Sequence, residues 1–218
     1  MVGRLSLLSA VLAVAGVLVS AAQTPRVQTF DQMSAGVLPP GFTTASLRQT
    51  QPGSWVVAKI GSTQALHHPA VQNADGWSLA LAPSDAIADL RLTVRLRLVA
   101  GNQTGGLVWH YQDARNFMAV LLDLDDGDDG DLELFRVSDG NRIRLEDRDG
   151  LELDPQAWHT VRVVHNDGRT TVSIGGIRVL DWNERRATSR AGRVGVVAHG
   201  HSDAAFDDLR IEHANSSR

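Results

Sequence analysis

Short runs of alternating apolar and polar residues, separated by Asp-Gly pairs, constrain the fold of this chain more than any other feature. The clearest run is Leu90–Leu98, in which four leucines and a valine alternate with arginines and a threonine. Successive side chains of a strand point to opposite faces, so this run buries one face and exposes the other. Asp-Gly pairs occur at 75–76, 126–127, 129–130, 139–140, 149–150 and 167–168. Both residue types tolerate the positive φ of a type I′ turn, and the pairs therefore predict hairpins.

The remaining chain predicts further strands by the same pattern of β-favouring residues between turn signals. They are expected at Ser54–Ile60, Gly76–Ala80, Gly105–Gln112, Phe117–Leu124, Leu132–Ser138, Arg142–Glu146, Trp158–Asn166, Thr170–Ile174, Ile177–Trp182, Arg193–Ala198 and Ala205–Glu212. No convincing helical period follows the N-terminal segment. Many short strands of this kind predict an all-β sandwich of two antiparallel sheets, a jelly roll.

The N-terminal residues 1–22 have the pattern of a secretory signal peptide. Arg4 supplies the positive charge, Leu5–Val19 the apolar run, and Ser20–Ala22 the small residues of a cleavage site. The run is shorter than the about 20 apolar residues that a membrane span needs. We therefore expect a secreted or periplasmic protein with one domain over residues 23–218, not integral to the membrane after cleavage. An uncleaved N-terminal anchor is the alternative.

Composition limits the classes of partner and of chemistry. The chain has no cysteine, which excludes disulfides, thiolate metal sites and a cysteine nucleophile. Without Arg4 the chain carries 20 basic and 25 acidic residues, a net charge of −5 with histidine neutral. Nucleic-acid binding needs a basic stripe, and no run of lysine and arginine occurs in the sequence. We therefore expect no nucleic-acid partner.

Several stretches together resemble a known superfamily. These are FDQMSAGVLPPGFT from Phe30, GGLVWHYQDARNF from Gly105, LELFRVSDGNRIRL from Leu132, WHTVRVVHNDGRTTVSIGGIRVLDW from Trp158 and GRVGVVAHGHSDAAFDDLRIE from Gly192. Their succession is similar to the concanavalin A-like lectin/glucanase superfamily, in the laminin G-like form of secreted bacterial proteins. The resemblance implies a concanavalin A-like jelly-roll sandwich, but it does not imply one activity, since the superfamily contains lectins, glycosidases and interaction domains. Leu121 stands where relatives often carry a polar residue, which indicates an altered binding groove.

Candidate catalytic residues do not match the pattern of the related glucanases. Those enzymes carry three carboxylates on one strand, E-x-D-x-x-E or E-x-D-x-E, whereas this chain offers Glu152 with Asp154, or Asp131 with Glu133. Glycoside hydrolysis needs two carboxyl groups at a fixed separation, and neither pair has the full pattern. A neighbouring family hydrolyses 3-keto-disaccharides. Proton abstraction beside a ketone would need a base such as His110 or His199, with a polarising group nearby.

Aromatic and basic residues are the candidates for binding a glycan, because flat rings stack on the C–H faces of sugars. Trp109, Tyr111 and Trp182 are the aromatic candidates, and His110 and Arg136 are the candidate hydrogen-bond donors. Strand alternation predicts that Trp109 and Tyr111 share one face, mostly packed, and that His110 points to the open face.

Three features could hold a metal ion. Asp31 lies near the first strand and Asp207 and Asp208 lie in the last one, where hard carboxylate oxygens could bind a structural calcium ion. The alternative is that these aspartates cap strand ends. His199 and His201 share a face and could bind zinc with Asp203, although a solvated loop is the favoured interpretation.

The third feature is the stretch from Asp123 to Asp131, which contains six aspartates. It fits no EF-hand register, because the glycines stand at the wrong positions of the loop. It is predicted to be a hairpin tip joining the strands at Phe117–Leu124 and Leu132–Ser138, with a loosely held cation as an optional addition.

These observations favour a carbohydrate-binding, lectin-like module without catalysis, whose partner is a glycan or another extracellular ligand. The alternative is a glycoside hydrolase or lyase that acts on modified sugars such as 3-keto-disaccharides. A purely structural or partner-binding module is the third possibility.

Overall fold

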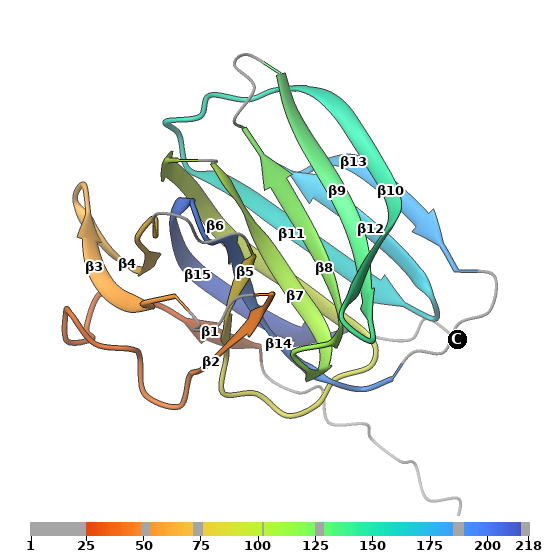
Figure 1. Cartoon of the computed structure of the whole chain (residues 1–218), viewed down its shortest axis with the longest axis horizontal. Coiled ribbons are helices and arrows are strands. Elements are labelled where there is room, and N and C mark those ends of the chain that lie inside the picture. Colours follow the sequence, from red (N-terminus) through yellow and green to blue (C-terminus); the bar gives the residue numbers. More distant parts are fainter. Residues whose placement is uncertain are drawn as a thin grey trace, which may run out of the picture.

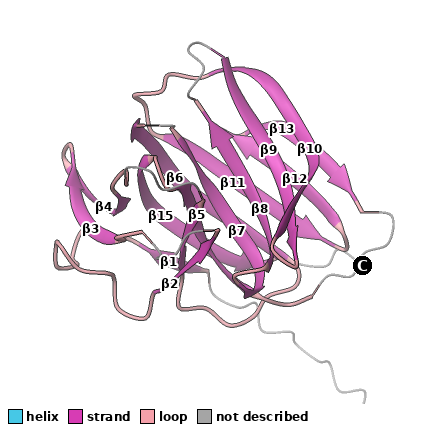
Figure 2. Cartoon of the chain, viewed as in Figure 1, coloured by secondary structure: helices cyan, strands magenta, loops and turns pink. Residues whose placement is uncertain are grey.

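The structure is a computed structural model, which describes residues 25–48, 53–71, 76–101, 103–124, 129–184 and 190–214. Every regular element in these ranges is a β-strand (Figure 2). The strands form two antiparallel sheets that pack face to face as a sandwich with a jelly-roll fold, as the sequence predicts (Figure 1). The expected signal peptide, residues 1–22, lies outside the described ranges. No helix within those ranges is long and apolar enough to cross a membrane.

Sheet A has eight strands. In spatial order they are β13 (Ile177–Asn183), β12 (Arg169–Ile174), β11 (His159–Asn166), β6 (Leu90–Ala100), β15 (Asp203–His213), β4 (Thr63–His68) and β3 (Val56–Ile60), with β1 (Arg26–Gln28) also pairing β15. Sheet B has seven strands, in the order β10 (Asn141–Glu152), β9 (Asp129–Ser138), β8 (Asn116–Asp123), β7 (Thr104–Asp113), β14 (Arg193–His199), β5 (Trp77–Leu81) and β2 (Thr43–Leu47). The strands β1, β2 and β4 were not expected from the sequence.

The core between the sheets follows the predicted alternation. All five apolar residues of Leu90–Leu98 at alternate positions are fully buried. Sheet B contributes residues such as Leu107 and Val120 from its inner face. Gly105 also faces this core, where a Cβ would come within 3.1 Å of a methyl group of Leu98. Alternate burial along each strand therefore explains why the two sheets stack.

Two of the Asp-Gly pairs form the predicted hairpin turns. Asp139 and Gly140 between β9 and β10, and Asp167 and Gly168 between β11 and β12, all have positive φ. The pair at 149–150 was wrongly predicted as a turn: it lies inside β10, where Gly150 has a φ of 71° beside a shift in register. An Asp-Gly pair can occur in a β-bulge as well as in a turn, because glycine adopts the positive φ that both can require.

The Asp-rich stretch joins strands that pair as a hairpin requires. Residues of β8 and β9 face each other in antiparallel register, with Asp123 opposite Asp131. The pair at 129–130 opens β9. The expected hairpin tip itself, residues 125–128, lies outside the described residues.

The outer face of sheet B carries a second apolar cluster, which we call the outer cluster. Its members are Leu47, Trp77, Leu79, Leu81, Val108, Phe117, Ala119, Leu121, Val137 and Val197, with Ala45, Tyr111 and Phe135 partly buried against them. The ring centroids of Trp77 on β5 and Phe135 on β9 are 5.2 Å apart. In a flat sheet these two strands would be about 19 Å apart, since neighbouring strands are spaced by about 4.8 Å. Sheet B is therefore strongly curved, and large side chains fill its concave outer face.

Replacement of Trp77 by alanine tests this packing. Trp77 is 2% exposed, and the guanidinium of Arg142 lies 5.2 Å from its ring centroid. We expect Trp77→Ala to lower the free energy of unfolding by about 3–5 kcal/mol in urea denaturation, the range for a buried tryptophan. The matched control is Ile177→Ala on β13, because Ile177 is 73% exposed. A loss no larger than that of the control would contradict a packed outer face.

Candidate functional site

A cavity of about 450 Å³ lies at one end of the sandwich, where strands from both sheets begin or end. Its lining includes His110 and Gln112 from β7, Met118 from β8, Arg136 from β9, His165 from β11 and Glu184 after β13. Arg190 and Asn116 add further polar groups. Residues from distant parts of the sequence thus converge on one polar cavity, which we call the end cavity.

A bulge in β7 turns His110 into this cavity. His110 has a φ of 51°, and the register between β7 and its neighbours shifts at this point. Its Nε2 is 2.7 Å from the carbonyl oxygen of Ala88, so Nε2 carries the hydrogen and donates it. Gly192 lies against the bulge, and a Cβ there would collide with the backbone of His110. The close approach of the two chains therefore requires glycine at this position.

His110 and His165 form a buried edge-to-face pair at the base of the end cavity. Their ring centroids are 4.6 Å apart at an interplanar angle of 86°. Nδ1 of His165 is 2.9 Å from the hydroxyl oxygen of Thr170, and its Nε2 is buried with no hydrogen-bond partner among the described residues. Burial lowers the pKa of His110, and burial followed by the neighbouring His110 lowers the pKa of His165 from 6.5 to about 4. Both imidazoles are therefore neutral at pH 7.

Arg136 forms a charged hydrogen bond at the side of the end cavity. Its Nη2 donates to Oε1 of Glu184 at 2.6 Å, and its guanidinium lies 6.0 Å from the ring centroid of Trp182. Both charged side chains are partly exposed, which leaves them open to a ligand. The ion pair and the ring together hold the guanidinium in one orientation.

The five ligand-binding candidates from the sequence separate into two sets. His110 and Arg136 line the end cavity, and Trp182 lies beside it through its contact with the guanidinium of Arg136. Trp109 is fully buried between the sheets, and Tyr111 packs against the outer cluster. The prediction that Trp109 and Tyr111 share a face is wrong, because the bulge at His110 inserts a residue and reverses the alternation.

His165 and Glu184 were missed by the sequence reasoning. The buried face of β11 carries Val161, Val163 and His165 at alternate positions. The sequence alone could therefore have indicated that His165 is a buried histidine. Glu184 follows the last residue of β13, and nothing in the local sequence indicates its contact with Arg136.

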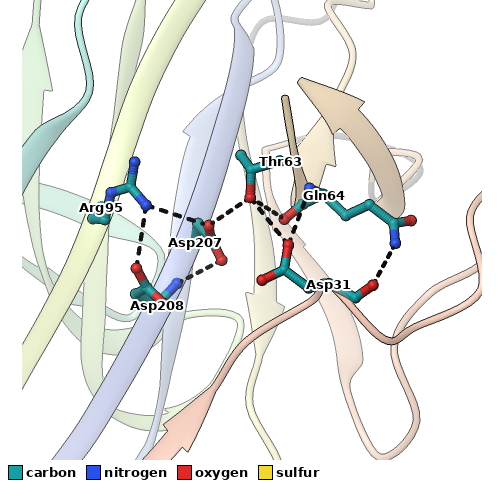
Figure 3. A network of polar contacts seen from close by, with 6 residues as sticks. All are labelled: Asp31, Thr63, Gln64, Arg95, Asp207 and Asp208. Carbon is teal, nitrogen blue, oxygen red and sulfur yellow. Dashed lines mark hydrogen bonds and ion pairs between the residues drawn. The ribbon is translucent and has the colours of Figure 1, made fainter. Parts of the chain in front are cut away.

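Of the candidate calcium ligands, Asp207 and Asp208 lie on β15 of sheet A, and Asp31 lies in a turn after β1 (Figure 3). The hydroxyl of Thr63 is 3.1 Å from Oδ1 of Asp31 and 3.3 Å from Oδ2 of Asp207. The guanidinium of Arg95 lies 3.6 Å from the carboxylate of Asp207 and 3.3 Å from that of Asp208. The positive charge of Arg95 thus pairs with both carboxylates at the place where a calcium ion was expected. Among the described residues, no three histidine or acidic side chains are arranged to hold a metal ion. Structural calcium at this place stays a prediction, which calcium titration of thermal unfolding can test.

The histidines near the β14–β15 turn make contacts of other kinds. His199 and His201 stack with their ring centroids 5.8 Å apart, and Nε2 of His67 is 2.7 Å from Oδ1 of Asp203. Asp203 is thus engaged by another histidine. The zinc hypothesis gains no support within the part of the chain that the structure describes.

The two packed antiparallel sheets and their strand order give the chain a concanavalin A-like fold. The chain is similar to the carbohydrate-binding module CBM66 from Bacillus subtilis, with a TM-score of 0.61 and 16% identity over 79% of this chain and 95% of that one. It is also similar to the exoplasmic/lumenal domain of VIP36 in its Ca²⁺- and Man-bound form, with a TM-score of 0.59 and 12% identity over 89% and 91% of the two chains.

A glycoside hydrolase has the same fold. The GH16 protein of the Bacteroides ovatus mixed-linkage glucan locus aligns with a TM-score of 0.54 and 8% identity over 81% of this chain and 94% of that one. No family model matches the chain, and no curated protein matches it. At these identities the comparisons establish the fold alone.

The buried histidine pair predicts a specific pH dependence of stability. In the unfolded chain His165 is exposed and has its ordinary pKa of 6.5, whereas in the folded chain its pKa is about 4. The contribution of His165 to the free energy of unfolding is therefore fully present above pH 6.5 and is lost as the pH falls toward about 4. The loss from His165 alone is about 3 kcal/mol. Denaturant unfolding at a series of pH values measures it. We expect His165→Gln to flatten the slope in this window, whereas the exposed His213→Gln should leave it unchanged; equal slopes for wild type and His165→Gln would contradict the assignment.

The contribution of Asp207 to stability is expected to change with pH in the opposite direction. Burial raises its pKa above the ordinary 3.8, although Arg95 and the backbone N–H of Asp208 oppose this. Its contribution to stability is therefore greatest below pH 3.8 and declines as the pH rises through the raised folded-state pKa. We expect the stability of wild type relative to Asp207→Asn to fall over that range in denaturant unfolding. A difference that grows with pH would show that Arg95 outweighs burial.

Proposed function

We propose that this chain is an exported, lectin-like carbohydrate-binding module that acts without catalysis and binds its glycan in the end cavity. The observation that carries the proposal is the convergence of polar side chains on this cavity, while the concave outer face of sheet B is filled by its own aromatic residues. The volume, about 450 Å³, lies within the range of small-molecule sites, about 300–1,000 Å³. Likeness in fold to a carbohydrate-binding module and to a Man-bound lectin domain supports the same class.

The chemistry of the end cavity suits a sugar. Sugar hydroxyls both donate and accept hydrogen bonds, and the cavity offers the donors of Arg136 beside the acceptor oxygens of Glu184. The amides of Gln112 and Asn116 can do either. Met118 adds an apolar surface that a C–H face of a sugar can contact.

The arrangement of acidic residues favours binding over hydrolysis. Glycoside hydrolysis uses two carboxyl groups on either side of the scissile bond. Of the acidic residues that line the end cavity, Glu184 is bound by Arg136, and Asp139 occupies the β9–β10 turn with a φ of 51°.

One observation favours a second candidate, a hydrolase or lyase acting on keto-sugars. His110 is neutral because burial lowers its pKa, and it lines the same cavity as Arg136. A neutral imidazole can accept a proton, and a guanidinium can polarise a ketone. Turnover of a 3-keto-glycoside that is abolished in His110→Ala would replace the binding proposal by this one.

Replacement of Arg136 tests the binding proposal. We expect the wild-type protein to bind at least one glycan on a broad array, and Arg136→Ala to weaken that binding about tenfold to a hundredfold, as for a lost hydrogen bond to a charged group. Glu184→Gln should weaken it less, because the amide still accepts a hydrogen bond.

Arg148→Ala is the matched control. Arg148 is exposed on β10 and lies outside the end cavity. Thermal melts of each variant establish that the fold is retained. The proposal would be overturned if the wild-type protein bound no glycan on the array or in polysaccharide pull-downs. Equal binding by Arg136→Ala and Arg148→Ala would also overturn it.

A further inference from the structure

A straight row of side chains crosses the outer face of sheet A. Thr93 at the centre of β6 faces Arg162 on β11 on one side and Arg210 on β15 on the other. Val27 on β1 extends the row beyond Arg210. The two arginines are therefore separated by two strand spacings, about 10 Å between backbones.

A second row places further polar groups beside the first. Arg95 on β6 faces Thr160 on β11, and Arg91 is the second residue of β6. The guanidinium of Arg95 lies 5.0 Å from the ring centroid of Trp158, which fixes its position. Together the rows line a shallow groove of about 570 Å³, which we call the arginine groove.

The arginine groove contains four arginines but only two carboxylates, so the carboxylates do not neutralise all of the guanidinium groups. Glu212 is shared, because one oxygen lies 3.8 Å from Arg91 and the other 3.1 Å from Arg210. Arg162 is exposed and donates from Nε to the hydroxyl of Thr93 at 3.3 Å. Within the described ranges it makes no ion pair, which leaves the terminal nitrogens of its guanidinium for a ligand.

We infer that the arginine groove is a second binding site, whose ligand is an acidic polysaccharide bearing carboxylates. The planar guanidiniums of Arg162 and Arg210 match the two oxygens of a carboxylate, which they can bind through paired hydrogen bonds. The carboxylate oxygens of Glu212 and Asp208 accept hydrogen bonds from sugar hydroxyls, and the hydroxyls of Thr93 and Thr160 can do either.

Mixed charge in the groove favours a sugar acid over a nucleic acid. A uronate presents hydroxyl donors next to its carboxylate, so it complements both the arginines and the acidic side chains. Nucleic acid carries one negative charge per about 1.7 Å of duplex and would meet Glu212 and Asp208 with repulsion.

Polygalacturonate and its fully methyl-esterified form provide a matched pair of probes, because esterification removes the charge and keeps the backbone. We expect the wild-type protein to bind polygalacturonate at low salt, to bind the ester at least tenfold more weakly, and to lose affinity as salt rises. Arg162→Gln with Arg210→Gln should reduce binding to polygalacturonate more than tenfold. Both residues are exposed, so the fold should be kept, and a thermal melt verifies this.

The controls separate this site from the end cavity. Arg148→Ala removes one charge from sheet B, and Arg136→Ala alters the end cavity; neither should change binding to polygalacturonate by more than twofold. The inference is overturned if the wild-type protein does not bind polygalacturonate, if it binds the ester equally, if the double variant binds like wild type, or if duplex DNA binds as tightly. Loss of binding in Arg136→Ala alone would place the acidic ligand in the end cavity and would also overturn it.

Discussion

Alternate side chains of both sheets fill the space between them, and the positions of the end cavity and of the arginine groove follow from that packing. On β6, Leu92, Val94 and Leu96 are fully buried, so Thr93 and Arg95 between them must face outward, as must Arg91 before them. Burial of each such residue contributes about 1.5–3 kcal/mol. The chain has no cysteine, and therefore no disulfide can supplement this core. The same alternation that stabilises the fold thus creates a basic outer surface.

The curvature of sheet B closes its concave face with large side chains. Trp77 and Phe135 meet across three intervening strands, and Leu121 lies in the same buried cluster. With the concave face filled, polar side chains converge instead at the end of the sandwich, where the bulge at His110 and the ion pair of Arg136 with Glu184 line a cavity.

Much of the fold could be predicted from the sequence, because strand alternation and two Asp-Gly turns are local signals. The short strands β1 and β2 were missed, since their pairing depends on the distant partners β15 and β5. Strand β4 was also missed, although it pairs with its sequence neighbour β3 as well as with β15. The candidate site was only partly predictable. His110 and Arg136 were candidates, but the strand pattern does not reveal the bulge that turns His110 into the cavity, nor the close approach of Gly192 to that bulge.

The central claim is that a glycan binds at the end of the sandwich and not on its concave face. A titration of ¹⁵N-labelled protein with a bound oligosaccharide, followed by nuclear magnetic resonance, tests it most directly. The account predicts that the side-chain signals of Arg136 and Trp182 shift while the indole signal of Trp77 does not, because Trp77 is buried in the outer cluster. Shifts centred on Trp77 with Arg136 unchanged would contradict it.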